Sequence, residues 1–207
     1  MVEKETPNKP RIWVFDLDGV LIDSTIRAKK HMDVSLKAAG RHEEWERCVW
    51  AFTTGDHGDD VIIRPGVALC NALVAYDRPD HVFIVTSRHT SEHAASVDTL
   101  EKGGVFDEWA PSGYFMRHDK RVCPVSNDVL VTPEEEFDHV THKGNILVGL
   151  QQQYEVLGVV DDHGGIVKRA QELGIHAIQP FFASIQCLQL FGDHISLGEP
   201  SVSGSKS

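Results

Sequence analysis

The chain has 207 residues, 41% of them hydrophobic and 25% charged, which is ordinary for a globular domain with a sizeable core. Its formal net charge of −11 disfavours a broad nucleic-acid-binding surface, but leaves room for one nucleotide or one strand end bound locally. No apolar stretch approaches the roughly 20 residues of a membrane span. Because Met1 to Arg11 also lack the apolar core of a signal peptide, we expect a cytoplasmic protein.

The cysteines and histidines do not form a recognisable metal or redox motif. Four cysteines lie far apart without a Cys-x-x-Cys pair, at Cys48, Cys70, Cys123 and Cys187. Buried thiols in a reducing compartment are therefore the better interpretation. The twelve histidines are scattered, and we expect mostly structural or surface roles for them.

The first predicted element is a strand over residues 11–16, after a flexible lead-in. Its apolar run is typical of a strand buried on both faces, and it ends in Asp16, Asp18 and Gly19. Two carboxylates held about 6–7 Å apart along an extended chain repel each other. The motif therefore favours a bound hard cation, although an acidic turn alone is the simpler alternative. A calcium loop is disfavoured, because no glutamate follows at the required position.

Two helices are predicted next, one over 25–39 after an N-cap at Ser24 and one over about 43–52. A polar, glycine-bearing loop follows from Thr53 to Asp60. Residues 24–63 are too long for a plain connection, so we expect a small helical cap over the acidic strand end. Its polar ends are candidate hinges for a lid that admits small or single-stranded substrates, although the helices could instead only cover apolar surface.

The second half of the predicted core begins with a helix over 66–77. A buried strand over 81–85 follows and ends in Thr86-Ser87-Arg88. Thr90 or Ser91 is then expected to cap a helix that runs to about Lys102.

The sequence pattern is less regular in the next part of the chain, residues 105–141. A short strand is expected over 114–116, and Thr132-Pro133-Glu134-Glu135 has the form of a capping box. The helix behind it, with a possible break near Gly144, carries Lys143 and runs to about Tyr154. The last predicted elements are a strand over 156–160 before Asp161-Asp162, a helix over 165–173, a strand over 175–178 and a closing helix over 181–191.

Alternating strands and helices predict an α/β fold, a doubly wound, Rossmann-like parallel sheet of about five strands with a small helical cap. We expect a core domain over 11–23 and 64–191, the cap over 24–63, and flexible tails over 1–10 and 192–207. The carboxyl ends of parallel strands meet at one edge of the sheet, where ligands bind. Two acidic pairs and the Thr86 hydroxyl should therefore meet there and form a site.

These motifs, in this order, resemble the four motifs of the haloacid dehalogenase superfamily of phosphotransferases. The resemblance runs from Asp16-Leu17-Asp18-Gly19-Val20 through Thr86 and Lys143 to Asp161-Asp162. It implies Mg²⁺ as cofactor, with the metal held by Asp16, Asp18 (through its backbone carbonyl), Asp161 and Asp162. The residues alone leave open which of the last two binds directly.

The resemblance also implies the catalytic roles. Asp16 would be the nucleophile that forms an aspartyl-phosphate, and Asp18 the general acid and base. Thr86 would donate to a phosphate oxygen, and Lys143 would supply a second positive charge. Each motif alone is weak, since Thr86 could be a plain strand-end residue and Lys143 an ordinary helix lysine.

A second, looser resemblance is to the 3′-phosphatase domain of bacteriophage polynucleotide kinase. It rests on Thr86-Ser87-Arg88, on Tyr114-Phe115-Met116-Arg117 with Asp119 and Arg121, on His142-Lys143 and on Val160-Asp161-Asp162-His163. It implies substrate binding by Ser87, Arg88 and Arg117, although the two arginines could equally form surface salt bridges. Residues 24–63 are additional to that domain or diverged from it.

The expected function is a Mg²⁺-dependent phosphatase acting on a nucleotide or a polynucleotide end. A phosphatase of small metabolites, a phosphomutase and a catalytically silent binding module remain as alternatives. A dehalogenase is disfavoured, because it would leave the second acidic pair unexplained. A kinase is disfavoured as well, since the sequence has no Gly-x-x-x-x-Gly-Lys-Ser/Thr phosphate loop.

Overall fold

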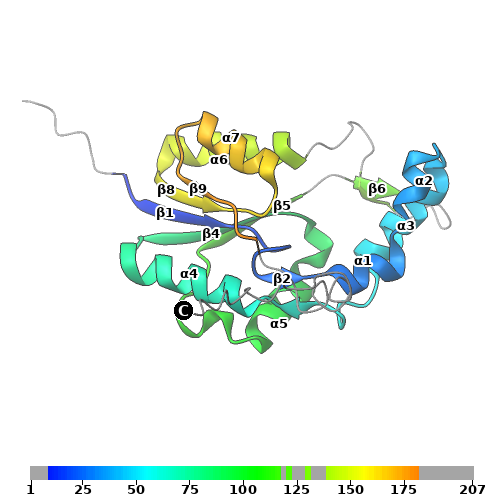
Figure 1. The fold of residues 1–207 in the computed structure, drawn as a ribbon, viewed down its shortest axis with the longest axis horizontal. Helices are drawn as coiled ribbons and strands as arrows, with labels where there is room; N and C mark the ends of the chain where they lie inside the picture. Colours follow the sequence, from blue (N-terminus) through cyan, green and yellow to red (C-terminus); the bar gives the residue numbers. More distant parts are fainter. Residues whose placement is uncertain (1–8, 118–119, 123–128, 132–138, 182–207) are drawn as a thin grey trace, which may run out of the picture.

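A computed structural model describes residues 9–117, 120–122, 129–131 and 139–181. Its centre is a five-stranded sheet with all neighbours parallel, in the order β5-β4-β1-β8-β9 (Figure 1). The strands are β1 (Arg11–Phe15), β4 (His81–His89), β5 (Gly113–Arg117), β8 (Glu155–Val160) and β9 (Ala177–Ile178). The predicted α/β, Rossmann-like parallel sheet of about five strands is confirmed.

Helices cover both faces of this sheet (Figure 1). One face carries α4 (Arg64–Asp77) and α5 (His93–Lys102), and the other carries α6 (His139–Gln153) and α7 (Gly164–Glu172). Single 3-10 turns, η1 (Thr90–Glu92) and η2 (Val105–Asp107), stand before and after α5.

The apolar residues of the central strand β1 are buried on both faces of the sheet. Successive side chains point to opposite faces of a strand. Trp13 and Phe15 accordingly pack in one core cluster with residues of α4 and α5. Ile12 and Val14 pack in a second cluster with residues of α6 and α7. Because both faces of β1 are buried, its end is fixed firmly, and the carboxylate that follows is held in place.

Residues 24–63 form a helical insertion between two short strands. Strand β2 (Ile22–Asp23) pairs antiparallel with β3 (Val61–Ile62), so the two ends of the insertion lie side by side. Between them come α1 (Thr25–His31), α2 (Val34–Ala38) and α3 (His42–Thr54). The single helix predicted over 25–39 is wrong, because Met32 is extended and the Asp33 carboxylate accepts the Ser35 N–H to begin a new helix.

Two further predictions are corrected. Strand β4 does not end at Val85 but continues to His89, after a shift in its pairing with β5. The side-chain cap expected at Thr90 or Ser91 is absent: α5 begins after Glu92, which makes no side-chain cap to it. The 3-10 turn η1 before it is capped by His89, whose ring accepts the Ser91 N–H and whose backbone N–H donates to Glu92.

Helix α6 differs from its prediction as well. It is continuous at Gly144, which packs against the Arg169 side chain of α7. The predicted capping box at 132–135, most of the predicted closing helix and the tail 192–207 lie outside the described residues. Between β5 and α6 the structure adds an antiparallel pair, β6 (Lys120–Val122) with β7 (Val129–Val131).

The two cysteines within the described residues are free thiols. Cys70 is buried, and burial raises the pKa of its thiol, whereas Cys48 is half-buried. Cys123 and Cys187 lie outside the described residues. None of the helices described is both long and apolar enough to pass through a membrane.

Candidate active site

Three carboxylates meet at the carboxyl ends of β1 and β8. Asp16 follows β1 and Asp161 follows β8, and the two strands are neighbours that are joined there by the Asp16 N–H to Val160 carbonyl bond of 2.9 Å. One ligand atom from each of Asp16, Asp161 and Asp162 lies within 4.8 Å of the others. Asp16 and Asp161 are buried, and Asp162 is exposed. The expected meeting of the two acidic motifs is therefore present.

Lys143 neutralises part of this charge. Its Nζ lies 2.7 Å from Asp16 Oδ2 and 2.7 Å from Asp161 Oδ2, and its side chain is 4% exposed. Burial disfavours the ammonium, but the two carboxylates outweigh it and raise the pKa of Lys143. One positive charge therefore faces three carboxyl groups, so the electrostatics of this cluster favour binding of a further cation.

The pKa values of Asp16 and Asp162 are raised in this cluster. Burial raises the pKa of Asp16 well above its usual value, with Lys143 opposing this and Asp161 adding to it. Burial and then the Asp161 charge raise the pKa of Asp162. A bound hard cation would favour the ionised forms of both groups.

Gly19 makes room for Asp162. Its φ of +76° lies in the left-handed region, and an ideal Cβ at this position would lie 2.2 Å from Asp162 Oδ2. Only a residue without a Cβ allows this approach. Mg²⁺ prefers hard oxygen ligands, which the three carboxylates provide, so the donor set and its surroundings fit that ion.

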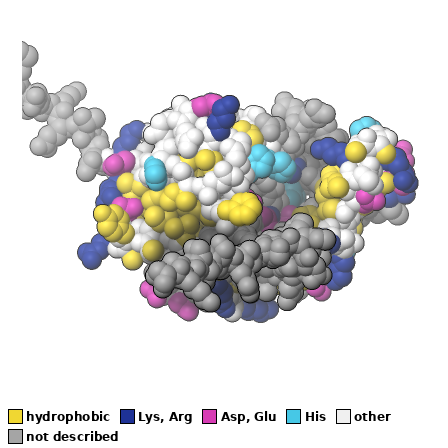
Figure 2. Space-filling model, viewed as in Figure 1, with side chains coloured by type: hydrophobic (Ala, Val, Ile, Leu, Met, Phe, Trp, Pro, Cys, Tyr) yellow, Lys and Arg dark blue, Asp and Glu magenta, His cyan; other side chains and the backbone are white. Residues whose placement is uncertain are grey.

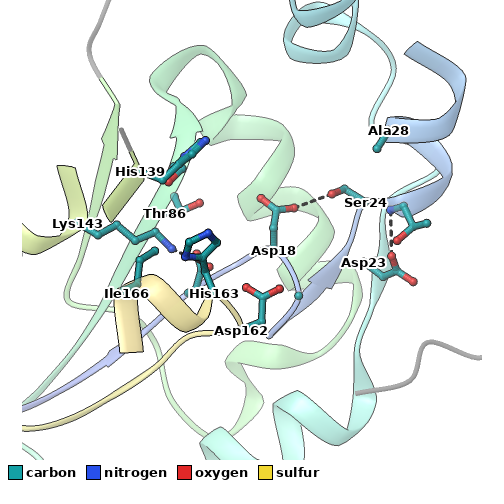
Figure 3. Close-up of a pocket in the computed structure, with 14 residues that line it drawn as sticks. Asp18, Asp23, Ser24, Ala28, Thr86, His139, Lys143, Asp162, His163 and Ile166 are labelled. Atoms are coloured by element: carbon teal, nitrogen blue, oxygen red, sulfur yellow. Dashed lines mark hydrogen bonds and ion pairs between the residues drawn. The ribbon is translucent and has the colours of Figure 1, made fainter. Parts of the chain in front are cut away.

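Asp18 turns away from this group. Figure 3 shows its carboxylate directed toward Ser24, whose hydroxyl donates to Asp18 Oδ1 at 2.8 Å. Arg88 donates to the same carboxylate from Nε (2.9 Å) and Nη2 (2.7 Å). Desolvation works to raise the pKa of Asp18, but Arg88 and then Ser24 outweigh it, so this pKa is lowered. The Asp18 side chain is thus not part of the metal group found among the described residues, and in the free chain it is ionised.

A cavity of about 370 Å³ opens over these residues (Figure 3). Asp16, Asp18, Thr86, Ser87 and Lys143 line it together with residues of the helical insertion. His139 and His163, from the beginnings of α6 and α7, complete the opposite wall. The Thr86 hydroxyl oxygen accepts the Arg88 N–H at 3.2 Å, which leaves its O–H free to donate into the cavity.

The predicted substrate residues divide into two groups. Ser87 lines the cavity, whereas Arg88 is buried beside it and engaged by carboxylates. Arg117 lies at the end of β5, in register with His89, and is absent from the cavity lining that the described residues form. The alternative of surface salt bridges is wrong for both arginines, since each is buried.

Sequence analysis missed several polar residues behind Asp18. Arg27 and Asp60 of the helical insertion, together with Glu92 of η1, form a buried ionic group that continues from Arg88. Their separations along the chain are long and share no period. The one available signal was the presence of a charged residue, Arg27, on an amphipathic helix beside the acidic motif.

Comparison with solved structures supports the α/β, Rossmann-like fold of this chain. No family model and no curated protein matches its sequence. Among solved structures, one chain of the Pnkp1/Rnl/Hen1 complex matches with a TM-score of 0.53 and 16% identity, over 84% of this chain and 47% of that one. A chain in another structure, titled as the Pnkp1/Rnl/Hen1 RNA repair complex, matches with a TM-score of 0.51 and 14% identity, over 83% and 42%.

A haloacid dehalogenase-like hydrolase from Streptococcus pneumoniae is also similar, with a TM-score of 0.49 and 16% identity over 82% of this chain and 83% of that one. The chain spans less than half of the length of the RNA repair chains that it matches. At these identities the likeness concerns the fold.

Proposed function

We propose that the chain is a Mg²⁺-dependent phosphatase that acts through an aspartyl-phosphate intermediate. The observation that carries this proposal is the position of Asp16. Its carboxylate is buried at the end of the central strand, 2.7 Å from the Lys143 ammonium and within 4.8 Å of two further carboxylates. A cavity lies directly over it.

The charges around Asp16 suit an anionic substrate only when a cation is added. Asp16, Asp161 and Asp162 would hold Mg²⁺, which supplies positive charge against the phosphate and lets a carboxylate approach it. Lys143 adds a fixed positive charge from the protein. The Thr86 hydroxyl, with its oxygen already accepting from the backbone, donates its proton to a phosphate oxygen.

The proposed reaction has two displacements at phosphorus. In the first, an Asp16 oxygen bonds to phosphorus, the bond to the leaving oxygen breaks, and Asp18 gives that oxygen a proton. In the second, water attacks the phosphoryl group on Asp16 while Asp18 takes a proton from the water, and phosphate and free Asp16 result. Asp18 must gain its first proton on substrate binding, which the negative charge of the arriving phosphate favours.

We propose a nucleotide or a polynucleotide 3′-end phosphate as the substrate. The motif resemblance to a 3′-phosphatase domain supports this, as does the likeness in fold to a chain of an RNA repair complex. Residues 25–54, which include α1 to α3, carry six Lys and Arg against four Asp and Glu, although the whole chain has a net charge of −11, and Thr25 and Ala28 of α1 line the cavity. Figure 2 shows Lys and Arg side chains gathered on this lobe. Such a lobe favours the approach of an anion.

The size of the cavity favours a second candidate, a phosphatase of small metabolites. About 370 Å³ is near the lower limit for small-molecule sites, and it accommodates a phosphate with a compact organic group. A polynucleotide would have to present only its end. A catalytically silent module has less support, because Asp16 lies beside Asp161, Asp162 and Lys143, the arrangement that the proposed chemistry needs.

Hydrolysis of p-nitrophenyl phosphate with and without Mg²⁺ tests the proposed chemistry. A panel of nucleoside monophosphates, 3′-phosphorylated oligonucleotides and sugar phosphates then tests the substrate. We expect Mg²⁺-dependent turnover, with the oligonucleotide 3′-phosphate hydrolysed fastest when it is single-stranded. Absence of turnover with every member at millimolar Mg²⁺ would contradict the proposal.

A further inference from the structure

Asp60, in the helical insertion, lies at the centre of a buried ionic group behind Asp18. Its side chain is fully buried, and its two oxygens hold two different guanidinium groups. Oδ1 accepts from Arg27 Nε at 2.8 Å, and Oδ2 accepts from Arg88 Nη2 at 2.9 Å. The same Arg88 Nη2 donates to Asp18 Oδ1 at 2.7 Å. One guanidinium nitrogen therefore joins Asp60 to Asp18.

The rest of the group fixes Asp60 and Arg27 in turn. Arg27 Nη1 donates to the Phe52 carbonyl at 2.8 Å and to Glu92 Oε2 at 3.0 Å. The His57 ring lies 3.4 Å from both Arg27 Nη1 and Asp60 Oδ2, and 3.9 Å from Glu92 Oε2. Arg27, His57 and Asp60 come from the insertion, whereas Arg88 and Glu92 come from the sheet domain. Buried charges held by several partners at once have little freedom to move.

Arg88 depends on Asp60 for its orientation. Its guanidinium donates from Nε and Nη2 to Asp18, and from Nη1 to the Ser96 hydroxyl at 2.9 Å. Asp60 is a second carboxylate partner for Nη2, so two carboxylates hold the guanidinium. Ser24, at the other end of the insertion, holds Asp18 Oδ1 directly. The two ends of the insertion thus both support the Asp18 carboxylate, Ser24 by a direct hydrogen bond and Asp60 through Arg88.

We propose that Asp60 is a positioning residue for the reaction, which holds Arg88 and through it keeps the Asp18 carboxylate directed at the leaving oxygen. This inference rests on the proposed function. Asp60 contacts neither the cavity nor the metal group described above, so it acts only through Arg88. The helical insertion is then part of the catalytic apparatus as well as a boundary of the cavity.

The test compares two aryl phosphates of similar shape. Phenyl phosphate needs a proton on its leaving oxygen, whereas p-nitrophenyl phosphate releases a more acidic phenol and needs it less. Asp60→Asn, which keeps the shape but removes the charge, should lower kcat for phenyl phosphate by about tenfold or more. For p-nitrophenyl phosphate the loss should be less than about threefold. Asp59→Asn is the matched control, because Asp59 pairs with Lys30 at the surface, and it should change neither rate.

A second measurement asks whether Asp60 acts through Asp18. In the Asp18→Asn background, Asp60→Asn should add no further loss of kcat for phenyl phosphate. If Asp60→Asn does not fold, Asp60→Glu keeps the charge, lengthens the side chain by one methylene and should give the same difference between the two substrates. Equal losses on both substrates, an additional loss in the Asp18→Asn background, or unchanged rates would overturn the proposal.

Unfolding by denaturant tests the coupling without any activity. Arg88 keeps one carboxylate partner in Asp18→Asn and one in Asp60→Asn, but it loses both in the double variant. The double variant should therefore lose more stability than the sum of the two single losses. A strictly additive loss would overturn the coupling, whereas a wild type without phosphatase activity would refute the proposed function alone.

Discussion

Adding one methyl group at Gly19 should displace Asp162 and weaken the proposed cation site. An ideal Cβ at Gly19 would lie 2.2 Å from Asp162 Oδ2, 2.4 Å from its Cγ and 3.0 Å from its Cβ. Asp162 is exposed, so its carboxylate can rotate away and Gly19→Ala should still fold. The left-handed φ of +76° adds a backbone cost of about 1–2 kcal/mol for alanine.

Gly174→Ala separates these two effects. Gly174 also has a left-handed φ, of +73°, but nothing lies within 4 Å of its ideal Cβ. Both variants should therefore lose about 1–2 kcal/mol, which lowers the Tm of a chain of this length by about 2–8 °C. Only Gly19→Ala should also change the response to Mg²⁺.

The expected change in that response follows from mass action. At one hundred times its Kd, Mg²⁺ should stabilise the wild type by about 2.7 kcal/mol, a rise in Tm of about 5–11 °C. Loss of one carboxylate from the group should raise the Kd about tenfold. At the same Mg²⁺ concentration the stabilisation then falls to about 1.4 kcal/mol, a rise of about 3–6 °C.

Thermal melts with and without Mg²⁺ measure this directly for the two variants and the wild type. Equal Mg²⁺ responses in Gly19→Ala and Gly174→Ala would refute the idea that Gly19 admits Asp162 to a cation site. If millimolar Mg²⁺ does not change the melting curve of the wild type, the proposed cation site is refuted.

The buried charges give three further predictions. Lys143→Met leaves two buried carboxylates without their cation, so it should lower the free energy of unfolding by about 3–5 kcal/mol in the absence of metal. Added Mg²⁺ should restore part of this stability, whereas Lys168→Met, at an exposed position, should lower it by less than about 0.5 kcal/mol. Burial opposes ionisation of Asp60, but the bond to His57 and the charge of Arg88 outweigh it and lower its pKa below the usual value of an aspartate. Asp60 therefore stabilises the fold above the pKa of an unfolded aspartate, and this contribution is lost as the pH falls through the lower pKa of the folded state. The free energy of unfolding should fall less steeply between about pH 5 and 3 in Asp60→Asn than in wild type or Asp59→Asn, and parallel curves would contradict this. Asp18→Asn should fold normally and lower kcat for phenyl phosphate by about 10²–10⁴, measured at saturating substrate, and a wild-type kcat would exclude Asp18 as the acid.

Much of the sheet and of the metal group could be predicted from local pattern. The apolar run before Asp16 and the one before Asp161 each predict a buried strand. Parallel topology then brings the strand ends to one edge, whatever the details of the chain between them. Lys143 needed more, since a lysine in a helix is usually solvated. Its position came from the resemblance in motif order, and the structure places it 2.7 Å from Asp16.

The surroundings of Asp18 could not be predicted in the same way. Asp18 and Arg88 are 70 residues apart, and Arg88 and Asp60 are 28 apart, so no period of a helix or strand relates them. Their pairing depends on how the helical insertion packs against β4, which is a tertiary property. The division of the predicted helix at Met32 has a different, local cause. The Asp33 cap begins a new helix there, although the apolar residues continue at helical spacing across it.

The central claim is a covalent bond between Asp16 and phosphorus, and mass spectrometry of the quenched enzyme tests it most directly. Wild-type protein with Mg²⁺ is mixed with p-nitrophenyl phosphate, quenched in acid within the first turnovers, digested and searched for a phosphorylated peptide. We predict one phosphoryl group on Asp16 in the wild type, and neither phosphorylation nor turnover in folded Asp16→Asn. A phosphoryl group on another residue, or turnover at the wild-type rate in Asp16→Asn, would contradict the account.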